Sequence, residues 1–271
     1  MTRTISSCIG NFILSTDAPH QFPKLPQVGD VMFFNTGSSF QHGPERISER
    51  PPYTQHVDWH ALYPNAICLH GPRKRRQIAL TFDDGPDNTW TPEILSVLSH
   101  FNVKATFNCV GQQVYYYPEV FHRIIQDGHI VENHSWDHPN FTKIPLSEAH
   151  SQIERTSSLM EQIVAIRPAL FRPPYGAINQ DVIKLVLSLR NRILYWDVDS
   201  LDWEGLTGKQ VAANVLAHAR AGSIVLMHFA GGKEGNLQGT VQALPRIITT
   251  LQREGFSFLT VSNLLNVPAY L

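Results

Sequence analysis

The sequence has almost no excess of charge of either sign. Its 22 Lys and Arg residues against 23 Asp and Glu residues give a formal net charge of -1. Because no global field attracts a polyanion, this balance argues against nucleic acid or an anionic membrane surface as the partner. A neutral substrate such as a sugar fits better. The one basic cluster, residues 73–76, is typical of a solvated segment leading into a strand.

Cysteine and long apolar runs are also scarce. Cys8, Cys68 and Cys109 are an odd number without C-x-x-C spacing, which predicts neither a disulfide framework nor a thiolate zinc site. The sequence holds no run of about 18 apolar residues, so we expect no integral membrane segment. The apolar stretch 5–14 is interrupted by polar residues, so it matches the pattern of a signal peptide only weakly. Export and oligomeric state are left open.

The chain of 271 residues falls into two parts of different texture. Eight of its 18 prolines lie in residues 1–72, which show no sustained periodicity, and this predicts an irregular N-terminal extension. From Gln77 onward short apolar runs alternate with amphipathic stretches, as in repeated βα units. With 42% hydrophobic residues the chain as a whole can bury a large core. We therefore expect one catalytic domain over residues 73–271.

The apolar runs predict about seven parallel strands. They are expected at 77–82, 104–110, 129–132, 169–172, 193–197, 223–227 and 256–260. Polar residues of the types that act in catalysis follow the carboxyl ends of several of these strands. Active sites of α/β barrels are built at these ends. In a doubly wound sheet, ligands gather at one switch point instead. The pattern thus favours an α/β fold with a distorted, incomplete (β/α) barrel.

Two adjacent carboxylates end the first of these strands. Asp83 and Asp84 come directly before Gly85 and Pro86, which turn the chain. Side chains of an extended segment alternate in direction, so one carboxylate can bind a metal while its neighbour faces water as a base. A simple Asp-Gly turn explains the pair equally well. Taken alone, the motif leaves both interpretations open.

Two pairs of histidines have the spacing of metal ligands. His134 and His138 are four residues apart, a distance that on a helical turn brings both rings to one face. His56 and His60 have the same spacing, but they lie in the proline-rich extension with no strand end to position them. The first pair with Asp84 offers one oxygen and two nitrogens to a divalent ion and leaves positions open for water and substrate. Zn²⁺ suits this set, but Co²⁺, nickel or iron could also bind, and the sequence does not distinguish them; availability favours zinc.

Two further motifs follow strand ends. Arg172 opens an R-P-P-Y-G segment, from which it can orient a carboxylate while a backbone N–H near Tyr175 faces an oxyanion. The acidic loop with Asp197, Asp199, Asp202 and Trp203 precedes an apolar strand that ends in His228. A histidine at a barrel rim is suited to donate a proton, and a nearby aspartate would raise its pKa and fix its tautomer. In isolation each motif also fits an ordinary turn or a satisfied rim residue.

The motifs in their order resemble one known family, the polysaccharide deacetylases of carbohydrate esterase family 4, also called the NodB homology domain. They are T-F-D-D-G at 81–85, H-S-W-D-H at 134–138, R-P-P-Y-G at 172–176, D-S-L-D-W at 199–203 and I-V-L-M-H at 224–228. Five ordered motifs make a chance match implausible. The resemblance covers residues 74–267 and leaves the first 72 outside it.

The resemblance implies a role for each motif residue. The catalytic set would be Asp83 as base, His228 as acid, Arg172 as the partner of the base and Asp202 as the partner of the acid, with Asp84, His134 and His138 as metal ligands. Substrate would be bound by the Tyr175 backbone and Pro173, with Trp203 and Leu226 walling a pocket for the acetyl methyl group.

These roles predict hydrolysis of an N-acetyl group on N-acetylglucosamine units of peptidoglycan or a chitin-type polymer. A bound metal would polarise the acetamide carbonyl and lower the pKa of water towards about 7, with Asp83 removing a proton from that water and His228 protonating the amine. An O-acetyl xylan esterase with the same metal site and a non-catalytic carbohydrate-binding relative are the alternatives. The substrate class favours an extracellular or cell-wall location.

Overall fold

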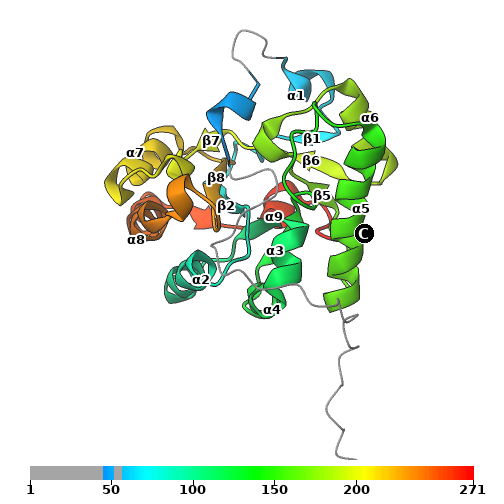
Figure 1. Cartoon of the computed structure of the whole chain (residues 1–271). Coiled ribbons are helices and arrows are strands. Elements are labelled where there is room, and N and C mark those ends of the chain that lie inside the picture. Colours follow the sequence, from blue (N-terminus) through cyan, green and yellow to red (C-terminus); the bar gives the residue numbers. More distant parts are fainter. Residues whose placement is uncertain (1–44, 52–56) are drawn as a thin grey trace, which may run out of the picture. The chain divides into compact units, whose positions relative to one another are not determined.

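The computed structural model of the chain describes residues 45–51 and 57–271. A parallel sheet forms the centre of the described part (Figure 1). Its strands are β1 (Ile67–Cys68), β2 (Gln77–Asp83), β3 (Thr106–Cys109), β4 (Ile130–Asn133), β5 (Leu170–Phe171), β6 (Arg192–Leu194), β7 (Val198–Asp199), β8 (Ile224–His228) and β9 (Ser257–Phe258).

The strand order is β1-β6-β5-β4-β3-β2-β8-β7, and β9 pairs with the start of β2. All these pairings are parallel, and the two end strands β1 and β7 are not hydrogen-bonded to each other. The sheet is therefore a curled barrel that does not close, as the sequence predicted. Parallel strands place their carboxyl ends on one edge, and that edge positions the site.

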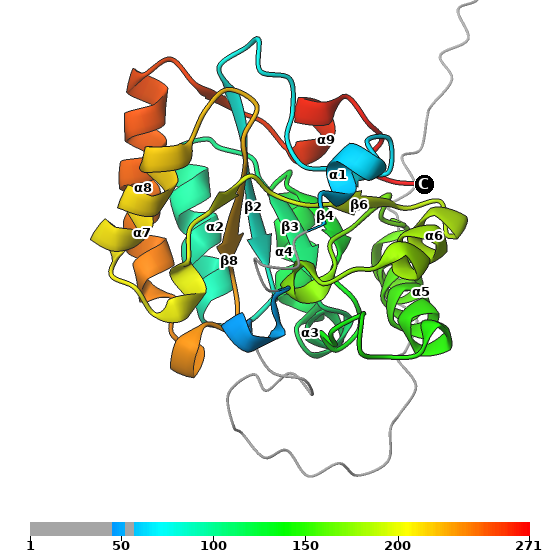
Figure 2. The same cartoon turned by 90° about the horizontal axis from the view of Figure 1, so that it is seen from above.

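Helices cover the outer faces of the sheet. They are α1 (Trp59–Leu62), α2 (Trp90–His100), α3 (Gly111–Tyr116), α4 (Pro118–Gln126), α5 (Leu146–Val164), α6 (Gln180–Ser188), α7 (Gly208–His218), α8 (Gln238–Arg253) and α9 (Val261–Leu265). In Figures 1 and 2, α7, α8 and α2 lie on one side of the strands and α5 and α6 on the other. A capping box of Thr207 and Gln210 begins α7, and Asp87 Oδ1 accepts the backbone N–H groups of Trp90 and Thr91 at the start of α2.

The side chains of β2 alternate between the hydrophobic core and the candidate site. Leu80 and Phe82 point into the largest hydrophobic cluster, which the helices α2 and α8 complete. Thr81 and Asp83 point to the other face, where both side chains bond Arg172. Because side chains of a strand alternate with a period of two, the apolar packing of Leu80 and Phe82 fixes the direction of Asp83.

Two short strands were not predicted. The first, β1, lies within the segment 1–72 that the sequence analysis treated as irregular, yet it pairs with β6. The second, β7, lies in the acidic loop and pairs with β8. Each has two residues, which is too short to show a period of two in the sequence. A domain boundary at residue 72 stays a prediction.

Three further features of the sequence can be compared with the described part of the chain. Cys68 and Cys109 are buried free thiols, and Cys8 lies outside the described residues. Among the described residues, no helix is long and apolar enough to cross a membrane. Arg73 of the basic cluster donates from Nη2 to Asp197 Oδ2 at 2.7 Å, so this cation is used within the fold.

Candidate active site

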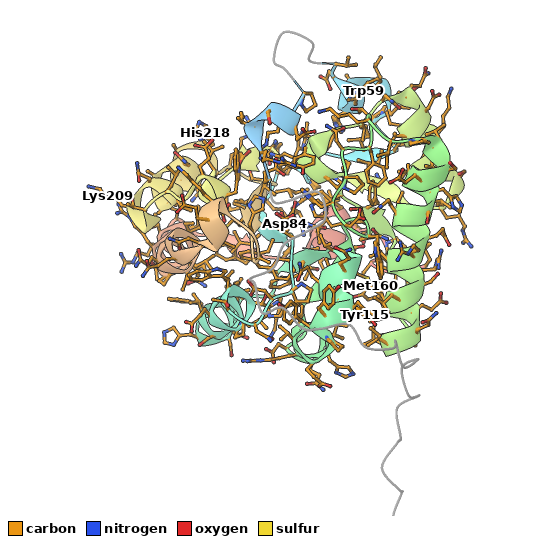
Figure 3. The ribbon with its side chains drawn as sticks, in the orientation of Figure 1. Trp59, Asp84, Tyr115, Met160, Lys209 and His218 are labelled. Carbon is orange, nitrogen blue, oxygen red and sulfur yellow. The ribbon has the colours of Figure 1, made fainter. Side chains whose placement is uncertain are left out.

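The carboxyl ends of β2, β4, β5 and β8 bring the expected residues together at one edge of the sheet. Figure 3 labels Asp84 of this group. Asp83, the last residue of β2, accepts hydrogen bonds at Oδ1 from Arg172 Nη1 and from Asn108 Nδ2, both at 2.7 Å. Arg172 is fully buried, and its guanidinium also donates to Thr81 Oγ1 and to the carbonyl of Tyr195. These bonds hold the Asp83 carboxylate in one orientation.

Asp84, His134 and His138 form a second cluster beside it. Asp84 Oδ1 lies 3.3 Å from His134 Nε2 and 3.2 Å from His138 Nε2, and all three side chains are buried. One ligand atom from each residue lies within 4.8 Å of the others, which fits a single ion. The other Asp84 oxygen, Oδ2, has no hydrogen-bond partner in the described part of the chain.

The histidines reach this position through an irregular turn and not through the helical turn that their spacing suggested. His134 directly follows β4, and the backbone has a φ of 69° at Ser135 and 66° at His138. Asp84 (φ 83°) and Tyr175 (φ 59°) are also in the left-handed region. Such residues cost of order 1–3 kcal/mol each and gather at functional sites. These turns lower the local stability of the backbone and direct the side chains into the cluster.

The donor set fits a divalent cation such as zinc. His134 Nδ1 donates to the carbonyl of Arg172 at 2.7 Å, which leaves the lone pair of Nε2 facing Asp84. A buried carboxylate oxygen without a hydrogen-bond donor costs free energy. A cation bound to Asp84 Oδ2 would remove that cost. Two imidazole nitrogens and one carboxylate oxygen are a ligand set of catalytic zinc sites. Asp84, His134 and His138 are thus suited to hold such an ion.

The ionisation of the cluster also suits metal binding. Burial opposes the Asp84 charge, but the neighbouring histidines hold the pKa of Asp84 below its usual range. Burial lowers the pKa of His138 to about 4, so this ring is neutral at pH 7. Burial also lowers the pKa of His134, yet the charges of Asp83 and Asp84 raise it overall. A cation that binds through His134 Nε2 takes the place of a proton there, so metal binding competes with protonation of this ring.

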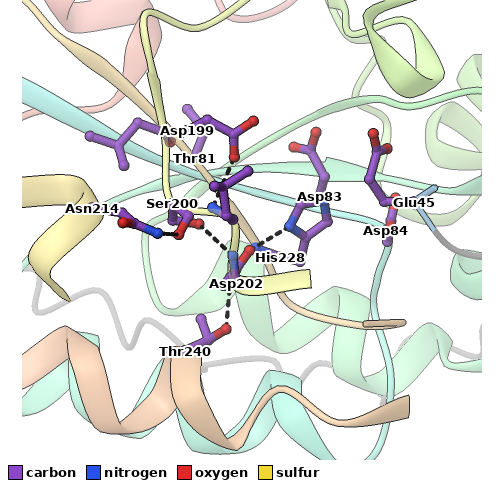
Figure 4. Close-up of polar contacts among 12 residues, drawn as sticks. Glu45, Thr81, Asp83, Asp84, Asp199, Ser200, Asp202, Asn214, His228 and Thr240 are labelled. Atoms are coloured by element: carbon purple, nitrogen blue, oxygen red, sulfur yellow. Dashed lines mark hydrogen bonds and ion pairs between the residues drawn. The ribbon is translucent and has the colours of Figure 1, made fainter. Parts of the chain in front are cut away.

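A histidine–aspartate pair lies on the other side of Asp83 (Figure 4). His228 ends β8, and its Nδ1 lies 2.7 Å from Asp202 Oδ1. Asp202 also accepts at Oδ2 from the His228 backbone N–H at 2.9 Å and from Thr240 Oγ1 at 2.7 Å. Burial lowers the pKa of His228, but the Asp202 charge and hydrogen bond outweigh it and raise that pKa to about 10. His228 is held as a proton donor.

The expected substrate-binding residues lie around these groups. Tyr175 is buried in the 3-10 turn η3 (Pro174–Gly176), and its ring packs edge-on against His138 at a centroid distance of 4.6 Å. Trp203 is buried in η4 (Asp202–Glu204), directly after Asp202. Leu226 and Pro173 are buried too. The roles of these four residues in binding substrate stay predictions.

Some residues named from the sequence lie elsewhere. Asp197 accepts from Arg73 and from the backbone N–H of Ile224, so it serves the sheet and not the cluster. Of the rival histidine pair, His56 lies outside the described residues. His60 uses Nδ1 in a 2.9 Å hydrogen bond with the carbonyl of Ile67.

Several described residues that sequence reasoning did not name contact the site, among them Thr240, which bonds Asp202. Asn108 on β3 bonds Asp83 from the neighbouring strand, at the position paired with Asp83 in the sheet. Glu45 and Arg50 come from the proline-rich region, and Arg50 bonds both Glu45 and Asp199 of the acidic loop. The register of β2 and β3 could have indicated Asn108. Nothing in the local sequence indicates that residues 45 and 50 reach the site.

Comparison with known proteins gives consistent matches. The family model described as polysaccharide deacetylase matches residues 70–193. The peptidoglycan-N-acetylglucosamine deacetylase of Bacillus cereus is 38% identical over 199 residues, which cover 73% of this chain and 72% of that protein. The peptidoglycan-N-acetylmuramic acid deacetylase of Bacillus subtilis is 37% identical over 193 residues, which cover 71% of this chain but 39% of that longer protein.

Solved structures show the same similarity. The crystal structure of a peptidoglycan N-acetylglucosamine deacetylase in complex with 4-naphthalen-1-yl-N-oxidanyl-benzamide superposes with a TM-score of 0.76. Its sequence is 34% identical, and the match covers 80% of this chain and 100% of that chain. The match thus extends over most of the described part of the fold.

Proposed function

The chain belongs to the polysaccharide deacetylase family, carbohydrate esterase family 4, and on that basis we propose that it is a metal-dependent hydrolase that removes N-acetyl groups from N-acetylglucosamine units of peptidoglycan or a chitin-type polymer. The observation that best supports this function is the arrangement around Asp83. A metal-ligand triad lies on one side of this carboxylate and a histidine–aspartate pair on the other.

The proposed reaction uses each group at a stated atom. A divalent ion, Zn²⁺ or Co²⁺, would polarise the acetamide carbonyl and make water more acidic. Asp83, oriented by Arg172 and Asn108, removes the proton from the water that attacks the carbonyl carbon. The backbone N–H of Tyr175 donates to the oxygen on which negative charge develops.

The second half of the reaction breaks the carbon–nitrogen bond. His228 protonates the amide nitrogen through Nε2, because Nδ1 is occupied by Asp202. Acetate and a free amine on the sugar result. Trp203 and Leu226 surround the methyl group, and Pro173 holds the loop from which Tyr175 donates. The high pKa of His228 keeps this proton in place at neutral pH.

The proposed partner is a polysaccharide or oligosaccharide, and the relatives suggest two candidate sugar units. One relative is named for N-acetylglucosamine and another for N-acetylmuramic acid. We favour N-acetylglucosamine, because the B. cereus relative matches over the larger share of its own length. A substrate of this class fits a function at the cell wall, in an extracellular or wall-associated location.

The pH dependence of the reaction should report the His228–Asp202 pair. The His228 pKa is raised by the Asp202 charge, so replacing Asp202 with Asn lowers that pKa. Protonated His228 is the active form, and it is lost as the pH rises through its pKa. We expect the alkaline limb of kcat/KM for the D202N variant to move to lower pH by about one unit or more. A limb that stays at the wild-type pH would remove His228 from the role of acid.

The test of the function is acetate release from a panel of substrates. Chitin oligomers, peptidoglycan and acetylxylan are incubated with the zinc-loaded protein, and acetate is quantified. We expect release from chitin oligomers or peptidoglycan at a rate above that from acetylxylan. Release from acetylxylan alone would favour an O-acetyl esterase. Sugar binding without any acetate release would show a non-catalytic relative.

A further inference from the structure

The groups proposed for catalysis are almost completely closed off in the described structure. Asp84 and His138 are 0% exposed, His228 is 1% exposed and Asp83 is 3% exposed, and Trp203, beside them, is only 6% exposed. An enzyme that acts on a sugar polymer must let a chain reach these atoms. The state described by the structure therefore excludes substrate, and a segment that covers the site must move before catalysis.

Residues 45–50, which we term the strap, are that segment. The strap includes the 3-10 turn η1 (Ile47–Glu49), lies N-terminal to the first strand of the sheet, and appears in blue near β7 in Figure 1. It makes contacts with three loops of the site. Arg50 bonds Asp199 at the end of β7, Arg46 bonds the Tyr175 side chain after β5, and Glu49 bonds Asn140 after β4.

The first strap residue points its carboxylate into the site. Glu45 is 8% exposed, and its charge interacts with both His228 and Asp84, next to which Figure 4 draws it. The end of a glutamate side chain is a CH₂–COO⁻ group, which has the chemistry of acetate. Acetate is also the product of the proposed reaction. Glu45 therefore places an acetate-like group beside the proposed proton donor and one of the proposed metal ligands.

Arg50 holds Glu45 in this position. Its Nε donates to Glu45 Oε1 at 2.6 Å, and its Nη1 bonds Asp199. The guanidinium lies over the ring of Trp203 at 5.0 Å from the centroid, so it covers the residue expected to wall the acetyl pocket. Arg50 Nη2 has no hydrogen-bond partner in the described part of the chain. A buried pair of this kind depends on both partners, because removing one leaves a costly unpaired charge.

The outer side of the strap is held more weakly. Glu49 Oε2 accepts from Lys143 Nζ at 2.8 Å and from Asn140 Nδ2 at 3.2 Å. The Lys143 side chain is 58% exposed, and an exposed pair of this kind contributes roughly 0–1 kcal/mol. The strap can thus detach from the outside without breaking the core of the fold.

We propose that residues 45–50 form an autoinhibitory strap that closes the active site, with the Glu45 carboxylate in the place of the acetyl group or of product acetate. The proposal rests on the function proposed above. Substrate binds only to the open state, so its apparent affinity is reduced by the fraction of molecules that are open. Weakening the strap increases that fraction and increases kcat/KM.

The test compares three variants with the wild-type full chain, all loaded with zinc and checked for metal content and melting temperature. E45A removes the acetate-like group, K143A weakens the outer contact without changing the site, and E148A is a matched control on exposed surface of α5. We expect E45A to increase kcat/KM for acetate release from a chitin oligomer about tenfold or more. K143A should increase it by a smaller factor, and E148A should match the wild type.

A binding measurement separates this proposal from the proposed function. Acetate itself is titrated against each zinc-loaded protein and followed by NMR. We expect E45A to bind acetate about tenfold or more tightly than the wild type, even if no variant releases acetate from any substrate. Tighter acetate binding without turnover would reject the function and retain the strap. Unchanged acetate affinity in E45A, or a kcat/KM that falls, would overturn the strap.

Discussion

The D83N variant should lose most of its activity while it still binds the metal. Asparagine has nearly the same shape but cannot accept the proton of the attacking water, and a general base contributes about 10²–10⁴-fold to a rate. Asp84, His134 and His138 are unchanged, so one ion per chain should remain. The measurement is kcat for acetate release together with the metal content of the purified variant. A kcat near that of the wild type would exclude Asp83 as the base.

A second buried aspartate supplies the control for this variant. Asp87 lies four residues further along and uses Oδ1 to accept the backbone N–H groups of Trp90 and Thr91 at the start of α2. Asparagine can keep these bonds through its own Oδ1, so D87N should retain wild-type kcat. Because D83N also removes one charge from the pair with Arg172, its melting temperature must be recorded. If D83N and D87N are both folded and only D83N loses kcat, the loss is due to the proton transfer at Asp83 and not to a general effect of replacing a buried aspartate.

Replacing His138 with Gln should remove metal binding and activity together. The ring provides one of the three ligand atoms, and changes even to residues that only support a metal ligand cost 10–100-fold in affinity. We expect the affinity of H138Q for zinc to fall by more than about 100-fold, with acetate release lost at micromolar zinc. Metal that binds only the folded state stabilises it, by about 2.7 kcal/mol at 100 times its dissociation constant. Added zinc should therefore raise the melting temperature of the wild type but not of H138Q.

The matched control is His129, a buried histidine away from the cluster. Its Nδ1 accepts from the backbone N–H of Ala105, and its ring packs edge-on against Phe107. H129Q tests whether loss of a buried imidazole alone changes metal binding. It should keep the zinc-dependent increase in melting temperature. An equal loss of that increase in both variants would remove His138 from the ligand set.

The sequence allowed the position of the candidate site residues to be predicted because these residues end strands whose apolar pattern is regular. Leu80 and Phe82 alternate with Thr81 and Asp83, so the direction of Asp83 follows from the strand. The two histidines were placed correctly beside Asp84 for an incorrect reason. Their spacing suggested a helical turn, whereas the chain forms an irregular turn with positive φ at Ser135 and His138. Spacing alone does not distinguish these backbones.

The rest of the site depends on contacts between residues distant in the chain. Asn108 reaches Asp83 through strand pairing, and Thr240 reaches Asp202 from the start of α8. Arg50 bonds Asp199, which is 149 residues away. No local pattern encodes such a contact, because proline-rich sequence around residues 44–52 has neither helical nor strand periodicity. The strap could therefore not be predicted from the sequence.

The measurement that tests the central claim most directly is acetate release from a chitin oligomer by protein from which all metal has been removed. Asp84 Oδ2 has no donor in the described structure, and His134 and His138 face the same position, so these residues offer a site for the ion that the proposed reaction uses. We predict that activity falls to background on complete chelation and returns when about one equivalent of zinc or cobalt is added. Undiminished acetate release by metal-free protein would contradict the account.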